Sequence, residues 1–113
     1  MMKLTEVKDF EPGKNPHNVE TRIVHDTEKA MVVHILLKPG ESLRKHITPV
    51  DVVFYVLEGH GVIEIGDERK EAGPDTVIES PARIPHRWIN NSPGLFRVLV
   101  MKLPRPTDKT IVL

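Results

Sequence analysis

Two histidines stand in segments of the sequence whose residue types could support chemistry. His46 lies within PGESLRKHITPVDVVFYVLEG and His86 within GPDTVIESPARIPHRWIN. Neutral imidazole is the commonest metal ligand among side chains and also serves as a general base near neutral pH. Residues i and i+2 of a strand point to the same side, so Thr48 should share a face with His46. A neutral hydroxyl binds divalent transition metals poorly, so Thr48 would add little to a metal site at this position.

The two segments resemble the two signature motifs of the cupin superfamily. The matching positions are Gly40, His46 and Gly59 in the first motif and Pro81, Pro85, His86 and Asn90 in the second. The resemblance covers about residues 30–103. It implies an all-β fold, namely a double-stranded β-helix or jelly-roll barrel of the cupin type.

The sequence departs from the family pattern at positions that matter for metal binding. Thr48 replaces the second histidine of the first motif, and the glutamate position falls at Val52, or at Val53 with the longer spacing. In the second motif Arg83 replaces a glycine, and the opening glycine aligns best with Pro74-Asp75. The resemblance therefore carries over an incomplete set of ligands.

The resemblance implies a site for one divalent ion, such as Zn, Mn, Fe or Ni, held by His46 and His86. His34 is the candidate third ligand, because it belongs to the more polar of the two alternating faces of its strand. His17 and His25 fall in the arm and an early strand, where we expect surface or hydrogen-bonded side chains, and His60 in its turn should be solvated. Four residues in the inward phase of the motifs should line the pocket: Thr48, Val52, Phe54 and Trp88.

Several functions remain open for this site, and the sequence does not decide whether turnover occurs. One is a small-molecule site with a divalent metal, including a dioxygenase, isomerase or decarboxylase acting on a small polar substrate. Another is a metal-free ligand-binding or sensing module, which the apolar Val52 favours because an organic ligand suits a methyl surface. A third is a metal-free enzyme with a neutral histidine as general base, although Tyr55, the only tyrosine, has the outward phase.

Short strands must position these residues, and helical periodicity is absent. Segments rich in β-branched and aromatic residues lie at 19–26, 30–38, 52–59, 61–67, 75–81, 86–91 and 95–103. Turn residues in EGHG (58–61) and GDER (66–69) predict hairpins on both sides of VIEI. Many short strands favour a closed barrel or a two-sheet jelly roll. We expect one barrel domain at 19–113, preceded by an irregular arm at 1–18 and ended by a short strand in IVL.

Charge and composition argue against several classes of function. The 16 basic and 16 acidic residues give a formal net charge of zero, so neither nucleic acid nor a membrane surface is an expected partner. Cysteine is absent, which excludes disulfides and thiolate chemistry. The first ten residues lack the apolar run of a signal peptide, and no segment has the ~18 apolar residues of a membrane span. We therefore expect a cytoplasmic protein.

Two features bear on partners. Residues 79–113 carry six basic and two acidic side chains, which is either ordinary surface scatter or a cationic rim of Arg83 and Arg87 for an anionic small molecule. VVFYVL and LFRVLVMKL have more apolar positions than one barrel core can use, and an irregular arm is more easily ordered on a partner. We expect a homodimer that binds a small-molecule ligand.

Overall fold

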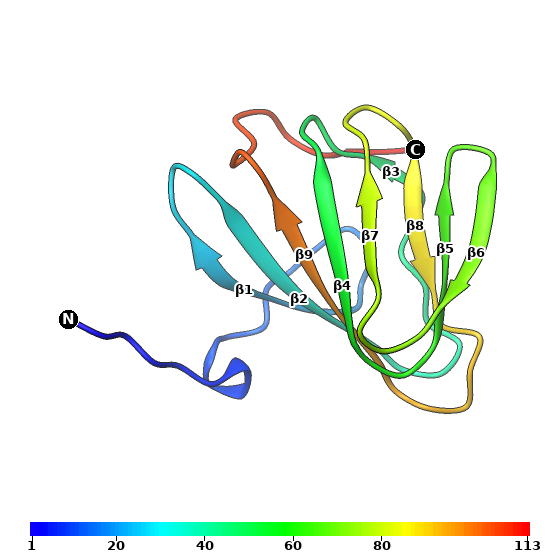
Figure 1. The fold of residues 1–113 in the computed structure, drawn as a ribbon, viewed down its shortest axis with the longest axis horizontal. Helices are drawn as coiled ribbons and strands as arrows, with labels where there is room; N and C mark the ends of the chain where they lie inside the picture. The colour runs from blue at the N-terminus through cyan, green and yellow to red at the C-terminus, as the bar shows by residue number, and fades with distance from the viewer.

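The chain folds into two five-stranded antiparallel sheets that face each other (Figure 1). This computed structural model describes residues 1–113. The strand order is β1-β2-β9-β4-β7 in the first sheet and β10-β3-β8-β5-β6 in the second. The strands are Glu20–Asp26 (β1), Met31–Leu37 (β2), His46–Ile47 (β3), Val52–Glu58 (β4), Gly61–Ile65 (β5), Glu68–Ala72 (β6), Val77–Ser80 (β7), His86–Ile89 (β8), Phe96–Lys102 (β9) and Ile111–Val112 (β10).

The predicted all-β jelly roll is confirmed, and each of the seven predicted segments contains one strand. After β2, most connections carry the chain from one sheet to the other.

The hairpin predicted at GDER joins β5 to β6, which pair along their length. The hairpin predicted at EGHG is wrong, because β4 and β5 belong to different sheets. Gly59 turns the chain there with φ of 81°, and an added Cβ would lie 2.1 Å from the Leu95 carbonyl oxygen.

The core lies between the two sheets and follows the alternation of the long central strands. Val52, Phe54 and Val56 of β4 are buried, and their partners on β9 continue the same buried face. Trp88 of β8 closes this core from the second sheet and is fully buried. Burial of each large apolar side chain contributes about 1.5–3 kcal/mol, so these alternating faces fix the register of both sheets.

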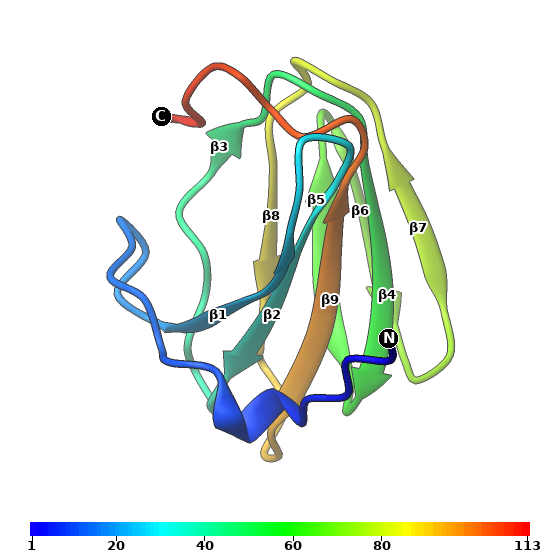
Figure 2. The same cartoon turned by 90° about the vertical axis from the view of Figure 1, so that its left-hand side faces the viewer.

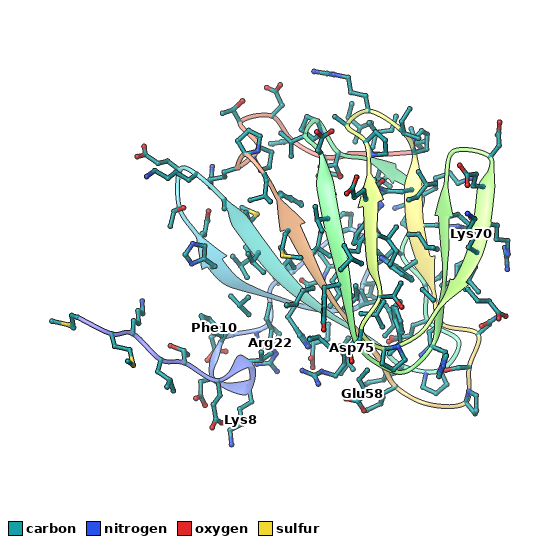
Figure 3. All side chains as sticks on the ribbon, in the orientation of Figure 1. Lys8, Phe10, Arg22, Glu58, Lys70 and Asp75 are labelled. Atoms are coloured by element: carbon teal, nitrogen blue, oxygen red, sulfur yellow. The ribbon has the colours of Figure 1, made fainter.

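The two ends of the chain lie on different parts of the barrel. Residues before β1 form only a short 3-10 turn at Val7–Asp9 and an isolated bridge from Gly13 to Thr21. The Arg22 side chain ties this arm to β1 by donating to the carbonyls of Lys8 and Phe10 (Figure 3). The predicted C-terminal strand is β10, and it pairs with β3. The C-terminus therefore lies beside β3 in both views, at the end of the barrel that we call the β3 end (Figures 1 and 2). No helix here has the length and apolar character needed to span a membrane.

Candidate functional site

His46 and His86 are direct neighbours across the antiparallel strands β3 and β8. Residues opposed in such a pair project from the same face of the sheet. Their Nε2 atoms are 3.1 Å apart, and both side chains are buried. The fold therefore brings together the two histidines of the sequence motifs at the β3 end of the barrel.

A directed chain of hydrogen bonds runs through the two rings. The carbonyl oxygen of Arg44 can only accept, so it receives the proton of His46 Nδ1 at 2.7 Å. The Nε2 atom of neutral His46 then lacks a proton and accepts from His86 Nε2. With its proton on Nε2, His86 accepts at Nδ1 from the Ser80 hydroxyl at 2.6 Å. Each ring thus uses both nitrogens, and the partners set the tautomers.

The surroundings of these rings disfavour a positive charge. Burial lowers the pKa of His86 to about 3, with further contributions from the charges of His46, Lys102 and His17. Burial also lowers the pKa of His46, although its bond to the Arg44 carbonyl acts in the opposite direction. Both rings are neutral at neutral pH, as the hydrogen-bond chain requires.

A third imidazole comes from the N-terminal arm. The ring of His17 lies 4.8 Å from the ring of His46, centroid to centroid. The Arg44 backbone N–H donates to His17 Nδ1 at 2.9 Å, so neutral His17 carries its proton on Nε2. Burial lowers the pKa of His17 to about 4, assisted by the charges of His46, Arg44 and Lys102. The hydrogen bond agrees with the expected surface or hydrogen-bonded His17, but no periodicity in the arm signals that this ring would lie beside His46.

Lys102 extends the inward face of β9 toward the same end of the barrel. It is the direct partner of Val52, which is buried on the core face. None of the seven ion pairs in the protein includes Lys102. Burial lowers its pKa, and its charge in turn lowers the pKa of His17, His46 and His86. The sequence did carry a signal, because Lys102 continues the alternation of the buried residues of FRVLVMK.

We call His17, His46, His86 and Lys102 the nitrogen cluster. The four residues predicted to line the pocket share the barrel interior with it: Thr48, Val52, Phe54 and Trp88 are each at most 2% exposed. The Thr48 hydroxyl is 3.3 Å from His86 Nε2, and the Phe54 ring packs edge-on against His86 at 5.4 Å. The indole Nε1 of Trp88 is buried without a hydrogen-bond partner. The interior thus offers an unused donor beside apolar walls.

His34 is not brought to this cluster. The apolar neighbours Ile35 and Leu37 occupy the core face of β2, and this leaves His34 on the outer face of the sheet. There His34 Nε2 accepts from Arg97 Nε at 3.0 Å. The strand buries its wholly apolar face in the core, so the more polar face cannot line the barrel interior.

Arg83 and Arg87 do not form a rim above the cluster. Arg87 alternates with His86 on β8, and its Nε atom donates to Glu64 Oε1 at 2.6 Å on the other face of the sheet. Arg83 is exposed in the connection before β8. The cation that accompanies the histidines is Lys102 instead.

The available donors do not fit a complete metal site. No group of three or more His, Cys, Asp or Glu side chains is arranged to hold a metal ion. Val52 offers no ligand atom, and the neighbouring Lys102 adds a positive charge that would repel a second cation. Two imidazoles would hold a divalent ion only weakly without a carboxylate or a third imidazole.

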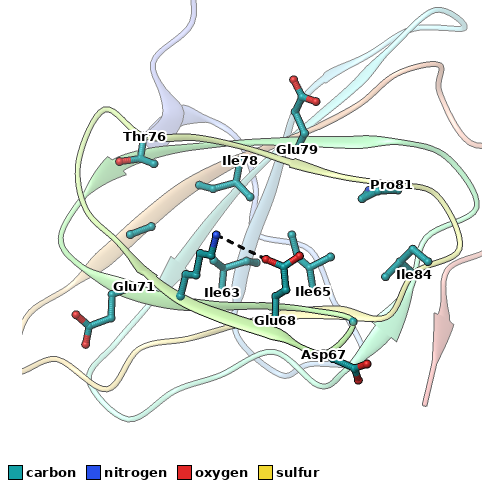
Figure 4. Close-up of a pocket in the computed structure, with 13 residues that line it drawn as sticks. Ile63, Ile65, Asp67, Glu68, Glu71, Thr76, Ile78, Glu79, Pro81 and Ile84 are labelled. Carbon is teal, nitrogen blue, oxygen red and sulfur yellow. Dashed lines mark ion pairs between the residues drawn. The ribbon is translucent and has the colours of Figure 1, made fainter.

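A separate cavity of about 690 Å³ opens between the edge strands β6 and β7, where the two sheets diverge (Figure 4). Isoleucine side chains form its floor, and Glu68, Glu71 and Glu79 stand along its rim. No histidine lines it. The cavity is therefore distinct from the nitrogen cluster.

Comparison with known proteins defines the family. The sequence profile described as Cupin domain matches residues 33–102, which is more than half of the chain. The protein therefore belongs to the cupin family. A search of curated proteins gave no match.

Solved structures agree with this fold. The polyketide cyclase RemF from Streptomyces resistomycificus aligns with a TM-score of 0.85 at 22% identity, over 100% of this chain and 86% of that one. TT1209 from Thermus thermophilus aligns with a TM-score of 0.79 at 29% identity, over 93% and 100%. An RmlC-like cupin from Methanocaldococcus jannaschii, described as a double-stranded β-helix, gives 0.75 at 18% identity, over 92% and 93%. Identities this low establish a shared fold and leave function to the site itself.

Proposed function

We propose that this cupin binds an organic small molecule at the β3 end of the barrel, beside His46 and His86, without a resident metal. The observation that carries the proposal is the 3.1 Å contact between the two buried Nε2 atoms in a site with no third ligand. Polar groups that converge on an apolar interior are typical of small-molecule sites.

The unused donors of the site indicate how such a ligand would be held. The Arg44 N–H already occupies His17 Nδ1, so the Nε2–H of neutral His17 is left to donate. The Trp88 indole N–H, buried in the core without a partner, is a second unused donor. A buried donor that lacks a partner costs about 1–3 kcal/mol, and an acceptor on the ligand would remove that cost.

The second candidate is the metal site implied by the family motifs, with His46 and His86 as ligands of one divalent ion. It is favoured by the 3.1 Å separation, since nitrogens this close can both reach one ion at bond lengths of about 2.0–2.1 Å. It requires His86 to transfer its proton from Nε2 to Nδ1, because a protonated nitrogen cannot coordinate. Water or substrate would have to supply the remaining ligands of a metal-dependent dioxygenase, isomerase or decarboxylase.

Trp88 provides the test, because it is the only tryptophan and its ring lies 5.5 Å from Phe54, which contacts His86. We expect EDTA-treated protein to show a saturable change in tryptophan emission with at least one member of a panel of sugars, carboxylates and amides. His46→Ala and His86→Ala should abolish it, whereas His60→Ala, at an exposed turn, should not. Circular dichroism confirms that the variants stay folded.

Two results would contradict the proposal. A response that appears only after Zn, Mn, Fe or Ni is added would favour the metal site. A saturable response that survives in both folded variants would place the ligand elsewhere, with the cavity between β6 and β7 as the next candidate.

A further inference from the structure

The nitrogen cluster gathers basic side chains from four separate parts of the chain. His17 comes from the arm, His46 from β3, His86 from β8 and Lys102 from β9. Pairing of β3 with β8, and of Lys102 with Val52, sets these positions through the backbone ladders. Strand pairing therefore positions His46, His86 and the backbone of Lys102, whereas His17 is held by the Arg44 N–H.

No acidic side chain balances this cluster. The charges that shift the pKa of the three histidines come from Lys102, Arg44 and the histidines themselves, and no carboxylate contributes. Lys102 has no ion-pair partner, and its pKa is lowered by burial alone. Lys102 follows the inward phase of Val98 and Val100 on β9 and is half-buried, so its ammonium group remains available to a ligand at this end of the barrel.

The neighbours of Lys102 cannot supply the missing charge. Val52 lies directly opposite on β4 and presents only methyl groups. Ser80 is the other cross-strand partner of Val52, and its hydroxyl already donates to His86. An anion from outside the chain is thus the natural counterpart of the ammonium group.

We propose that the ligand of this site is a small organic anion whose carboxylate binds between the Lys102 ammonium group and the His17 imidazole of the nitrogen cluster. The inference rests on the proposed function and names the class of ligand. The His17 Nε2–H donates to the same carboxylate, so the N-terminal arm contributes to binding. A charge-assisted hydrogen bond from ammonium to carboxylate is about twice as strong as a neutral one.

The inference is tested by calorimetric titration of the full-length, EDTA-treated protein with acetate and malonate at constant ionic strength. Acetamide and malonamide serve as uncharged counterparts of nearly the same shape. We expect the carboxylates to bind and the amides to bind at least about tenfold more weakly.

Variants of Lys102 separate charge from shape. Lys102→Met removes the charge and should weaken carboxylate binding about ten- to hundredfold, whereas Lys102→Arg should retain most of it. Lys70→Met is the matched control, because Lys70 is exposed on the edge strand β6 and pairs with Glu68. It should bind like the wild type. Thermal unfolding should show Lys102→Met to be about as stable as the wild type, because Lys102 is half-buried and makes no ion pair that the substitution would break.

The possible failures are distinguishable. Equal binding of amides and carboxylates, or full affinity in Lys102→Met, would overturn the anion assignment and leave the small-molecule site intact. If no carboxylate or amide binds, and no compound changes Trp88 emission, both the anion assignment and the proposed function are wrong.

Discussion

The contact between His46 and His86 depends on both rings being neutral, because one Nε2 atom must donate and the other must accept. Burial supplies this condition, since it lowers the pKa of both rings. The Arg44 carbonyl then fixes which nitrogen of each ring carries the proton, and the Ser80 hydroxyl donates to the remaining nitrogen of His86. Protonation of either ring would break the chain and place a positive charge near Lys102.

This arrangement predicts a loss of stability in mild acid. The pKa of His86 falls from 6.5 to about 3 on folding, so below pH 6.5 the unfolded chain binds more protons than the folded one. The free energy of unfolding is therefore highest above pH 6.5 and falls as the pH drops toward 3. Between pH 7 and pH 5, His86 alone should cost about 2 kcal/mol.

Urea denaturation of metal-free protein at several pH values measures this loss. His86→Asn should remove the His86 contribution and flatten the pH dependence, whereas His60→Asn, at an exposed turn, should keep the wild-type slope. Equal slopes for the wild type and His86→Asn would show that His86 is not held neutral by the fold.

The sequence placed His46 and His86 together, with Thr48 and Phe54 beside them, but it did not place His17 and Lys102 with this pair. His46 and His86 were found from motif spacing, because strand pairing places those two motif positions opposite each other. Lys102 could have been found from the alternation of β9, which continues one step beyond its last buried valine. His17 could not, because an irregular arm has no periodicity that fixes the direction of a side chain.

At the scale of elements, two residues that stand at glycine positions of the second motif keep the backbone conformation that glycine prefers. Arg83 has φ of 66° and Asp75 has φ of 61°, both in the left-handed region. The turn geometry has thus been kept with residues that adopt it at a cost of about 1–2 kcal/mol. Arg83 also donates its backbone N–H to the Thr48 carbonyl at 2.9 Å, so its turn supports the strand connection beside His46.

Arg83→Gly should therefore stabilise the protein by about 1 kcal/mol, because glycine adopts this conformation without strain. The Arg83 side chain is exposed and makes no hydrogen bond or ion pair, so little is lost with it. Ala82→Gly is the control at the adjacent position, where φ is not positive, and it should lower stability instead. Denaturant midpoints of the wild type, Arg83→Gly and Ala82→Gly measure these changes. A loss of stability in Arg83→Gly would refute the proposal that Arg83 is strained.

Strands with alternating apolar residues were predictable, whereas the charged strand β6 was not. Its residues ERKEA are exposed except for Ala72, since β6 lies at the edge of its sheet. The strand therefore lacks the alternating apolar residues from which a strand is predicted. The turn EGHG was misassigned because glycine specifies a reversal of the chain without specifying which sheet receives it. Pairing partners depend on long-range packing that local turn residues do not encode.

At the scale of the whole molecule, the arm and the first sheet leave an apolar groove of about 760 Å³. Val7, Phe10, Ile23, Val32 and Leu99 are among its lining residues, and Ile23 is 50% exposed. We propose that this outer face of the first sheet is the interface of a homodimer. An isologous contact would cover the groove and the neighbouring edge strand β1 in both copies.

Light scattering coupled to size exclusion should give twice the monomer mass of 12.8 kDa at micromolar concentration. Ile23→Asp should shift the protein toward the monomer, because a carboxylate in an apolar interface is costly to desolvate. Val77→Asp changes an exposed residue on the opposite edge strand β7 and should leave the mass unchanged. A monomeric wild type would exclude the interface.

The central claim is that the nitrogen cluster forms an organic-ligand site without a resident metal, and elemental mass spectrometry tests it most directly. The untagged protein is incubated with Mn, Fe, Ni and Zn, dialysed and analysed beside His46→Ala and His86→Ala. We expect far less than one metal ion per chain in all three proteins. One ion per chain in the wild type, lost in both variants, would contradict it and would establish the two-histidine metal site.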